Sequence, residues 1–161
     1  MSTSVEAFRA ALRRILQDQH QALREVIDGL DSDALNWTPG PMTNSLSVLC
    51  AHLLEAERFL LSTACGEEYP RDREAAFQYR APDAAALRAM IDQGEATVLS
   101  LIDRLSEDDL VAERAPAADR LGRRGQGVWW ALRAVEHNRE HIGQALLTRQ
   151  LYEQHAAARS E

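Results

Sequence analysis

The stretch that decides the fold is WWALRAVEHNREHIGQALLTRQLY, residues 129–152. It contains no proline and consists largely of strong helix formers, so it predicts a long helix. His137 and His141 stand four residues apart in it. In a helix this spacing places both imidazoles on one face, with Cβ atoms about 5–6 Å apart. Two such imidazoles are either ordinary polar residues or two ligands of one divalent ion, and the second reading needs a third ligand from elsewhere in the chain.

The rest of the chain shows the same helical periodicity. Apolar residues recur at spacings of three and four, which is typical of amphipathic helices. Four amphipathic helices in 161 residues predict an all-α protein, a four-helix bundle and one domain over residues 1–161. The helices are expected at residues 4–30, 45–64, 82–105 and 126–153, with a long connection at 66–81, a short turn at 106–110 and a loop at 115–127. Leu132 and Leu146 are among the apolar residues of the last helix that are expected to face the core.

Composition excludes several functional classes. The formal net charge is −7 and no basic face is evident, so nucleic acid is a poor partner. No apolar run approaches the roughly 20 residues of a membrane span, and the first residues lack the apolar core of a signal peptide. Cys50 and Cys65 lie in one expected helix, about 22 Å apart by helical rise, which is too far for a disulfide. They indicate reduced thiols in a cytoplasmic protein.

His52 supplies the third candidate ligand. It lies in VLCAHLLEAERFLL, residues 48–61, on the face expected to point into the bundle. Buried histidines need hydrogen-bond partners, and one cation satisfies three inward imidazoles from two helices most economically. Three nitrogen ligands leave positions for water or substrate, which is the composition of a catalytic site. His20 is a fourth inward candidate, with local hydrogen bonding as the equal alternative, and no role is assigned to His155.

Acidic residues near the histidines have two readings. Glu55 and Glu140 each lie three residues after a candidate ligand, and could orient an imidazole. The alternative is that both are solvated charges on a helix face. A carboxylate di-iron site requires Glu-x-x-His pairs, whereas Glu136 and Glu140 directly precede histidines. Ferritin-like chemistry is therefore not expected.

Tryptophans and loop arginines have two readings as well. The three tryptophans either line a substrate pocket or pack in the core, and core packing is the preferred interpretation. Arg120, Arg123 and Arg124 either meet an anionic substrate or form a solvated basic loop, and the solvated loop is preferred.

Two segments together resemble the DinB/YfiT-like family of metalloenzymes. They are NSLSVLCAHLLEAERF, residues 44–59, and the C-terminal stretch quoted above, with its H-x-x-x-H-hydrophobic-G-Q motif. The resemblance implies a four-helix bundle of up-down-down-up type, often a homodimer. It also implies that His52, His137 and His141 are ligands of a divalent metal ion, zinc or nickel. Several members of that family are transferases or isomerases that use a low-molecular-weight thiol.

These observations lead to three functional hypotheses. The first is a divalent-metal-dependent enzyme that acts on a small molecule, as a low-molecular-weight-thiol S-transferase or, with the same centre, a hydrolase. The second is a non-catalytic metal-binding or stress-response helical dimer. The third is a helical dimerisation module whose histidines hold only water. Neither a nucleic acid nor a membrane is expected as a partner.

Overall fold

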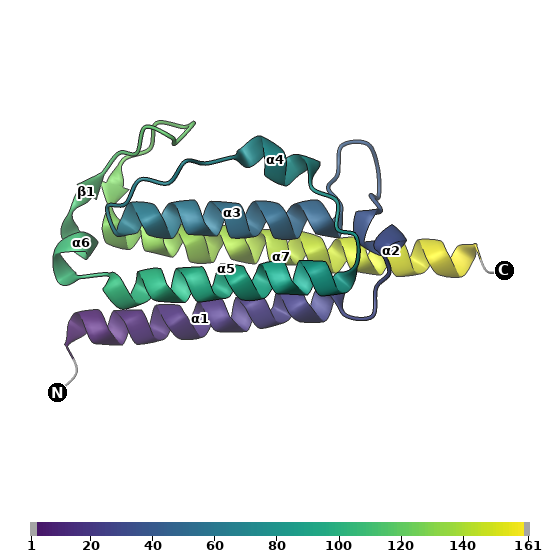
Figure 1. The fold of residues 1–161 in the computed structure, drawn as a ribbon, viewed down its shortest axis with the longest axis horizontal. Coiled ribbons are helices and arrows are strands. Elements are labelled where there is room, and N and C mark those ends of the chain that lie inside the picture. Colours follow the sequence, from purple (N-terminus) through teal and green to yellow (C-terminus); the bar gives the residue numbers. More distant parts are fainter. Residues whose placement is uncertain (1–2, 160–161) are drawn as a thin grey trace.

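Four long helices lie side by side in the computed structural model, which describes residues 3–159 (Figure 1). The expected domain of residues 1–161 therefore extends beyond the described residues at both ends. Thr3 and Ser45 cap two of the helices with their side-chain oxygens, and Asp83 caps a third. The four helices are α1 (Ser4–Ile27), α3 (Leu46–Ala64), α5 (Ala84–Arg104) and α7 (Gly127–Ala158). The prediction of an all-α protein with four main helices is confirmed.

The helices enclose a core in which α3 is the most buried element. α3 packs against α5 and α7, and α1 packs against the same two helices from the other side. α3 also contacts the short helices α2 (Ser32–Asn36) and α4 (Arg73–Gln78). Because it is covered on so many sides, even its polar residues His52 and Glu57 are buried.

A long connection joins α3 to α5 and carries α4. It runs back along the length of the bundle, over α3, from the end of α3 to the start of α5 (Figure 1). The long connection expected at residues 66–81 is thus present, but the sequence reading missed α4 within it and α2 before α3. Both helices are too short to show a periodicity. Each does begin after an aspartate, Asp72 or Asp31, whose side chain caps it.

The connection between α5 and α7 contains a short helix and a two-stranded hairpin. The turn expected at residues 106–110 is helix α6 (Glu107–Val111), capped by Ser106. Strands β1 (Glu113–Arg114) and β2 (Gly125–Gln126) pair antiparallel and enclose the expected loop. The loop is therefore shorter than the predicted 115–127.

Two expected features of the long helices were wrong. α1 ends at Ile27 and not at residue 30, because Asp28 adopts an extended conformation with a ψ of 133° and Gly29 follows it at a φ of +72°. Leu132 and Leu146 of α7 were expected to face the core, but they are 53% and 47% exposed. The core-facing side of α7 instead carries Trp130, small alanines and Ile142, so these leucines lie outside the contact with α1 and α3.

Among residues 3–159, no helix combines the length and the apolar character that crossing a membrane requires.

Candidate metal centre

Three histidines from two helices converge in the structure. His52 comes from the middle of α3, and His137 and His141 from successive turns of α7. One ligand nitrogen from each lies within 4.8 Å of the other two. In the described part of the chain this is the only cluster of three or more histidine, cysteine or acidic side chains that could hold a metal ion. The convergence predicted from sequence is therefore present.

The two histidines of α7 already have the spacing of ligands that share an ion. Nε2 of His137 lies 3.1 Å from Nε2 of His141. Two nitrogens each about 2.0–2.1 Å from a tetrahedral ion would stand roughly 3.3 Å apart. The ring of His52 completes the group, with its centroid 5.2 Å from that of His137 and 4.9 Å from that of His141.

Gln144 fixes the orientation of the His141 ring. Its Oε1 lies 2.8 Å from Nδ1 of His141, one turn further along α7. An amide oxygen only accepts hydrogen bonds, so this contact selects the tautomer with hydrogen on Nδ1. The lone pair on Nε2 of His141 is thereby left free to point into the cluster, which is the form that a metal ligand requires.

Burial keeps the other two imidazoles neutral. It lowers the pKa of His52 to about 4, with smaller contributions from His141, Arg73 and Arg71. It lowers the pKa of His137 to about 3, helped by the neighbouring imidazoles and then by Arg71 and Arg133. Nδ1 of each ring is buried and lacks a hydrogen-bond partner among the described residues. Neutral imidazoles fit a divalent cation, since metal binding requires the unprotonated ring.

One side of the cluster is covered by α4. The ring of Phe77 packs on that of His52, with centroids 4.6 Å apart. The guanidinium carbon of Arg73 lies 4.3 Å from the centroid of the same Phe77 ring. The connection between α3 and α5 thus forms a wall of the site, which periodicity along the sequence did not reveal.

His20 does not join this cluster. It is buried in α1, and its Nε2 lies 2.9 Å from Oε2 of Glu57 on α3. The other oxygen of Glu57 accepts a 2.7 Å hydrogen bond from Asn138 of α7. His20 is therefore a hydrogen-bonded core residue, but its partner lies on another helix and not in the local segment that the sequence suggested. Glu57 and Asn138 were missed, although Glu57 lies four residues after Leu53 on the core-facing stripe.

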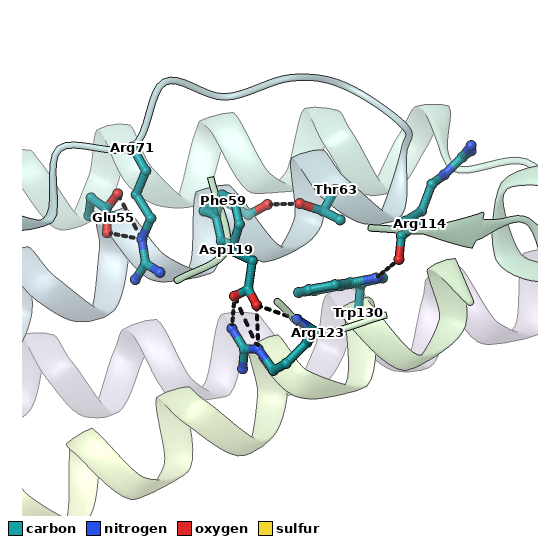
Figure 2. Close-up of polar contacts among 8 residues, drawn as sticks. All are labelled: Glu55, Phe59, Thr63, Arg71, Arg114, Asp119, Arg123 and Trp130. Atoms are coloured by element: carbon teal, nitrogen blue, oxygen red, sulfur yellow. Dashed lines mark hydrogen bonds and ion pairs between the residues drawn. The ribbon is translucent and has the colours of Figure 1, made fainter. Parts of the chain in front are cut away.

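The acidic residues singled out beside the histidines have other partners. Glu55 is 11% exposed at its side chain and accepts two hydrogen bonds from Nε of Arg71, at 3.0 and 3.2 Å (Figure 2). It is neither solvated nor bonded to an imidazole. Glu136 pairs with Arg133, and Glu140 is exposed, as expected for a charge on the outer face of α7.

The predictions for the tryptophans and the loop arginines are partly confirmed. Trp130 is fully buried and its Nε1 donates to the carbonyl oxygen of Arg114, whereas Trp129 is 36% exposed. Arg123 is only 23% exposed at its side chain: it binds the buried carboxylate of Asp119, and its guanidinium carbon lies 5.4 Å from the centroid of the Trp130 ring (Figure 2). Arg124 does pair with an exposed glutamate, as a surface residue would.

Acid is expected to destabilise the metal-free protein through these histidines. Both pKa values lie below the roughly 6.5 of an unfolded histidine, so the unfolded state binds more protons as the pH falls from about 6.5 towards 4. Stability is therefore present above pH 6.5 and declines below it. Urea unfolding at pH 7 and pH 5 should show a lower midpoint at pH 5, and a smaller drop in a His52→Leu variant. Equal drops in both proteins would contradict the assignment.

With this geometry in view, the comparisons with known proteins identify the family. A sequence profile of the DinB superfamily matches residues 15–145, and the chain therefore belongs to that superfamily. Among curated proteins, none matches the sequence.

Solved structures share the fold at low sequence identity. A DinB-like protein from Bacillus subtilis has a TM-score of 0.67 at 17% identity, and the match covers 87% of this chain and 90% of that one. A conserved protein from Enterococcus faecalis has a TM-score of 0.73 at 16% identity, covering 90% and 96%. A DinB-like protein from Bacillus cereus has a TM-score of 0.65 at 14% identity, covering 84% and 89%.

Proposed function

We propose that His52, His137 and His141 bind a divalent metal ion, zinc or nickel, and that the protein is a low-molecular-weight-thiol S-transferase acting on a small molecule. The observation that carries this proposal is the convergence of three ligand nitrogens within 4.8 Å on rings that burial holds neutral. Three imidazoles leave the full charge on the ion and a position open for an incoming ligand.

A divalent ion held by these three histidines would make a bound thiol or water more acidic, since it lowers the pKa of that ligand. In the transfer, the thiol sulfur forms a bond to an electrophilic carbon, the leaving group departs with its electron pair, and the thiol proton goes to solvent. The chain's own residues position the ligands: Gln144 orients His141, and Phe77 packs on His52 and shields it from water.

The protein's own cysteines do not fit the role of nucleophile. Cys50 is buried, which raises its pKa to about 12, and burial raises the pKa of Cys65 to about 11. Neither is a thiolate at neutral pH, and the thiolate is the reactive form. This supports a thiol that enters as a separate molecule.

The function is tested by metal analysis and by conjugation assays. Purified protein should contain close to one zinc or nickel per chain, and should conjugate chlorodinitrobenzene or monobromobimane with at least one of several low-molecular-weight thiols. Chelation should abolish turnover and added metal should restore it. If the protein binds metal but shows no turnover with any thiol, the non-catalytic metal-binding dimer is favoured. If it hydrolyses esters without a thiol, the hydrolase is favoured. If it contains no metal, only the helical dimerisation module is left.

Removing the contact to His141 is expected to weaken metal binding. Gln144→Leu keeps the size and helix propensity of the side chain but loses the oxygen 2.8 Å from Nδ1 of His141. Losing such an orienting partner typically lowers metal affinity about 10–100-fold. Competition with a chromophoric chelator measures this change. Gln150→Leu, on an exposed position of the same helix, is the matched control and should bind metal like the wild type.

We further propose a cytoplasmic homodimer of single-domain chains. Exposed apolar side chains support the dimer, because Leu132 and Leu146 of α7 lie on one stripe of the helix, with Ile15 of α1 also 42% exposed. Gly143 lies exposed on the same stripe and leaves room for a close approach.

A charge placed on this stripe should separate the two subunits. Leu132→Glu and Leu146→Glu are expected to convert the dimer to a monomer with little loss of folding stability, since both side chains are about half exposed. Light scattering after size-exclusion chromatography measures the mass. Met42→Glu, at a side chain 94% exposed in another part of the surface, is the control. A dimer that persists in both leucine variants would place the interface elsewhere.

A further inference from the structure

Among the described residues Arg73 forms no ion pair with a carboxylate, although burial raises the pKa of nearby Glu55 and the charge of Arg73 acts to lower it. It lies in the first turn of α4, with its guanidinium carbon 4.3 Å from the centroid of the Phe77 ring. That ring packs in turn on His52, at 4.6 Å. Arg73 makes no hydrogen bond or ion pair in the part of the chain that the structure describes. An unpaired cation therefore lies one aromatic ring away from a proposed metal ligand.

Arg71 lies two residues earlier and is only partly used by its partner. Its Nε donates to both oxygens of Glu55, and its guanidinium carbon lies 4.9 Å from the centroid of the Phe59 ring. No partner for either Nη group occurs among residues 3–159, although the side chain is only 12% exposed. In Figure 2 the Nη atoms extend past Glu55 in the direction of the bundle. The contacts with Glu55 and Phe59 therefore hold the guanidinium of Arg71 in place, and its Nη groups can donate hydrogen bonds to a ligand.

Both arginines lie beside the histidine cluster. Arg73 packs on the Phe77 ring that contacts His52. Arg71 binds Glu55, which lies one turn after His52 in α3. After burial and the neighbouring imidazole, Arg73 and Arg71 are the next causes of the lowered pKa of His52. Arg71 also contributes to the lowered pKa of His137, as does Arg133 one turn before it. Nε of Arg133 is buried and has no hydrogen-bond partner among residues 3–159, while its Nη1 pairs with Glu136.

A bound metal would make the surroundings of the cluster positively charged. Glu55 pairs with Arg71 and Glu136 pairs with Arg133, whereas Arg73 pairs with no carboxylate among the described residues, and the metal would add two positive charges. Like charges gathered in a partly buried region repel one another unless an anion is present. A guanidinium presents paired donors that match the two oxygens of a carboxylate.

We propose that Arg71 and Arg73 form a carboxylate-binding site beside the histidine cluster, so that the small molecule acted on at this centre is a carboxylate. The proposal rests on the proposed function, because the same molecule or its co-substrate must reach the metal. The carboxylate could belong to the thiol or to the electrophile. The chemistry of recognition is the same in both cases, and the experiment separates them.

The first arm uses cobalt-loaded protein and two thiols of equal size. 3-Mercaptopropionate and 3-mercaptopropionamide differ only in charge, and the sulfur-to-cobalt absorption band reports the binding of either. We expect 3-mercaptopropionate to bind at least about 10-fold more tightly than 3-mercaptopropionamide. This preference should be lost in Arg73→Gln and in Arg71→Lys, which keeps a cation opposite Glu55 but removes the paired donors. Arg14→Gln, which removes an exposed arginine of α1, should retain the preference.

The second arm tests the electrophile. With 2-mercaptoethanol bound to the cobalt protein, butyrate should perturb the band at a lower concentration than butyramide if the carboxylate belongs to the second substrate. A preference in either arm that disappears in Arg73→Gln supports the proposal and assigns the carboxylate. Equal binding of acid and amide in both arms overturns the proposal and leaves the proposed function intact. A cobalt protein that shows no band with any thiol overturns the thiol-transferase function, and this proposal with it.

Discussion

His137→Ala is expected to reduce metal affinity by more than about 100-fold, since loss of a group that only orients a ligand already costs about 10–100-fold. The imidazole of His137 lies close to both other rings, with its Nε2 3.1 Å from Nε2 of His141 and its ring centroid 5.2 Å from that of His52. Its removal leaves two nitrogens, which bind zinc or nickel weakly. His52→Ala should have an effect of the same order. Chelator competition at pH 7 measures both.

A matched histidine variant controls for nonspecific effects of these changes. His155→Ala removes an exposed imidazole near the end of α7 that stacks on Trp37, far along the helix from the cluster. It should bind metal as the wild type does. Full metal occupancy in both His52→Ala and His137→Ala would show that these nitrogens do not form the site, whatever their spacing.

Glu57→Ala is expected to lower the free energy of unfolding by about 3–5 kcal/mol, as is typical when one partner of a buried ionisable pair is removed. The carboxylate of Glu57 is fully buried and joins three helices, because it contacts His20 of α1 and Asn138 of α7 from its own position in α3. Its loss leaves a buried imidazole and a buried amide without their acceptor, and opens a cavity in the core. Urea unfolding of the metal-free protein measures the change.

Two further variants separate the buried contacts of Glu57 from its charge and from helix propensity. Glu57→Gln retains the shape and one acceptor oxygen, and should lose less stability than Glu57→Ala. Glu140→Ala removes an exposed glutamate of α7 and should change the free energy of unfolding by no more than about 0.5 kcal/mol. A Glu57→Ala protein as stable as the Glu140→Ala protein would mean that the buried contacts contribute little.

The sequence predicted the histidine cluster better than its surroundings. His137 and His141 share a face because of their spacing alone, and His52 follows from its place on an apolar stripe. Their meeting needs only that α3 and α7 pack together, which they do extensively. Gln144 belongs to the motif of the last helix, yet its role depends on the rotamer of His141, which the motif does not specify.

Residues that contact the cluster from other segments could not be predicted in this way. Phe77 contacts His52, and Arg71 and Arg73 lie nearby, because the connection between α3 and α5 crosses over α3. No periodicity marks a connection of this kind, and six helical residues are too few to reveal α4. The pairing of Glu57 with Asn138, 81 residues away, is likewise a contact between helices and not within one.

The sequence by itself determined the four long helices, because helix formation depends on local propensity, capping and the spacing of apolar side chains. It also determined that two imidazoles stand together on the last helix. Only the tertiary structure decided which apolar faces are covered, leaving Leu132 and Leu146 exposed while burying Glu57. The reason is that periodicity describes one helix at a time, whereas burial and charge at a site depend on neighbours that are distant in the chain.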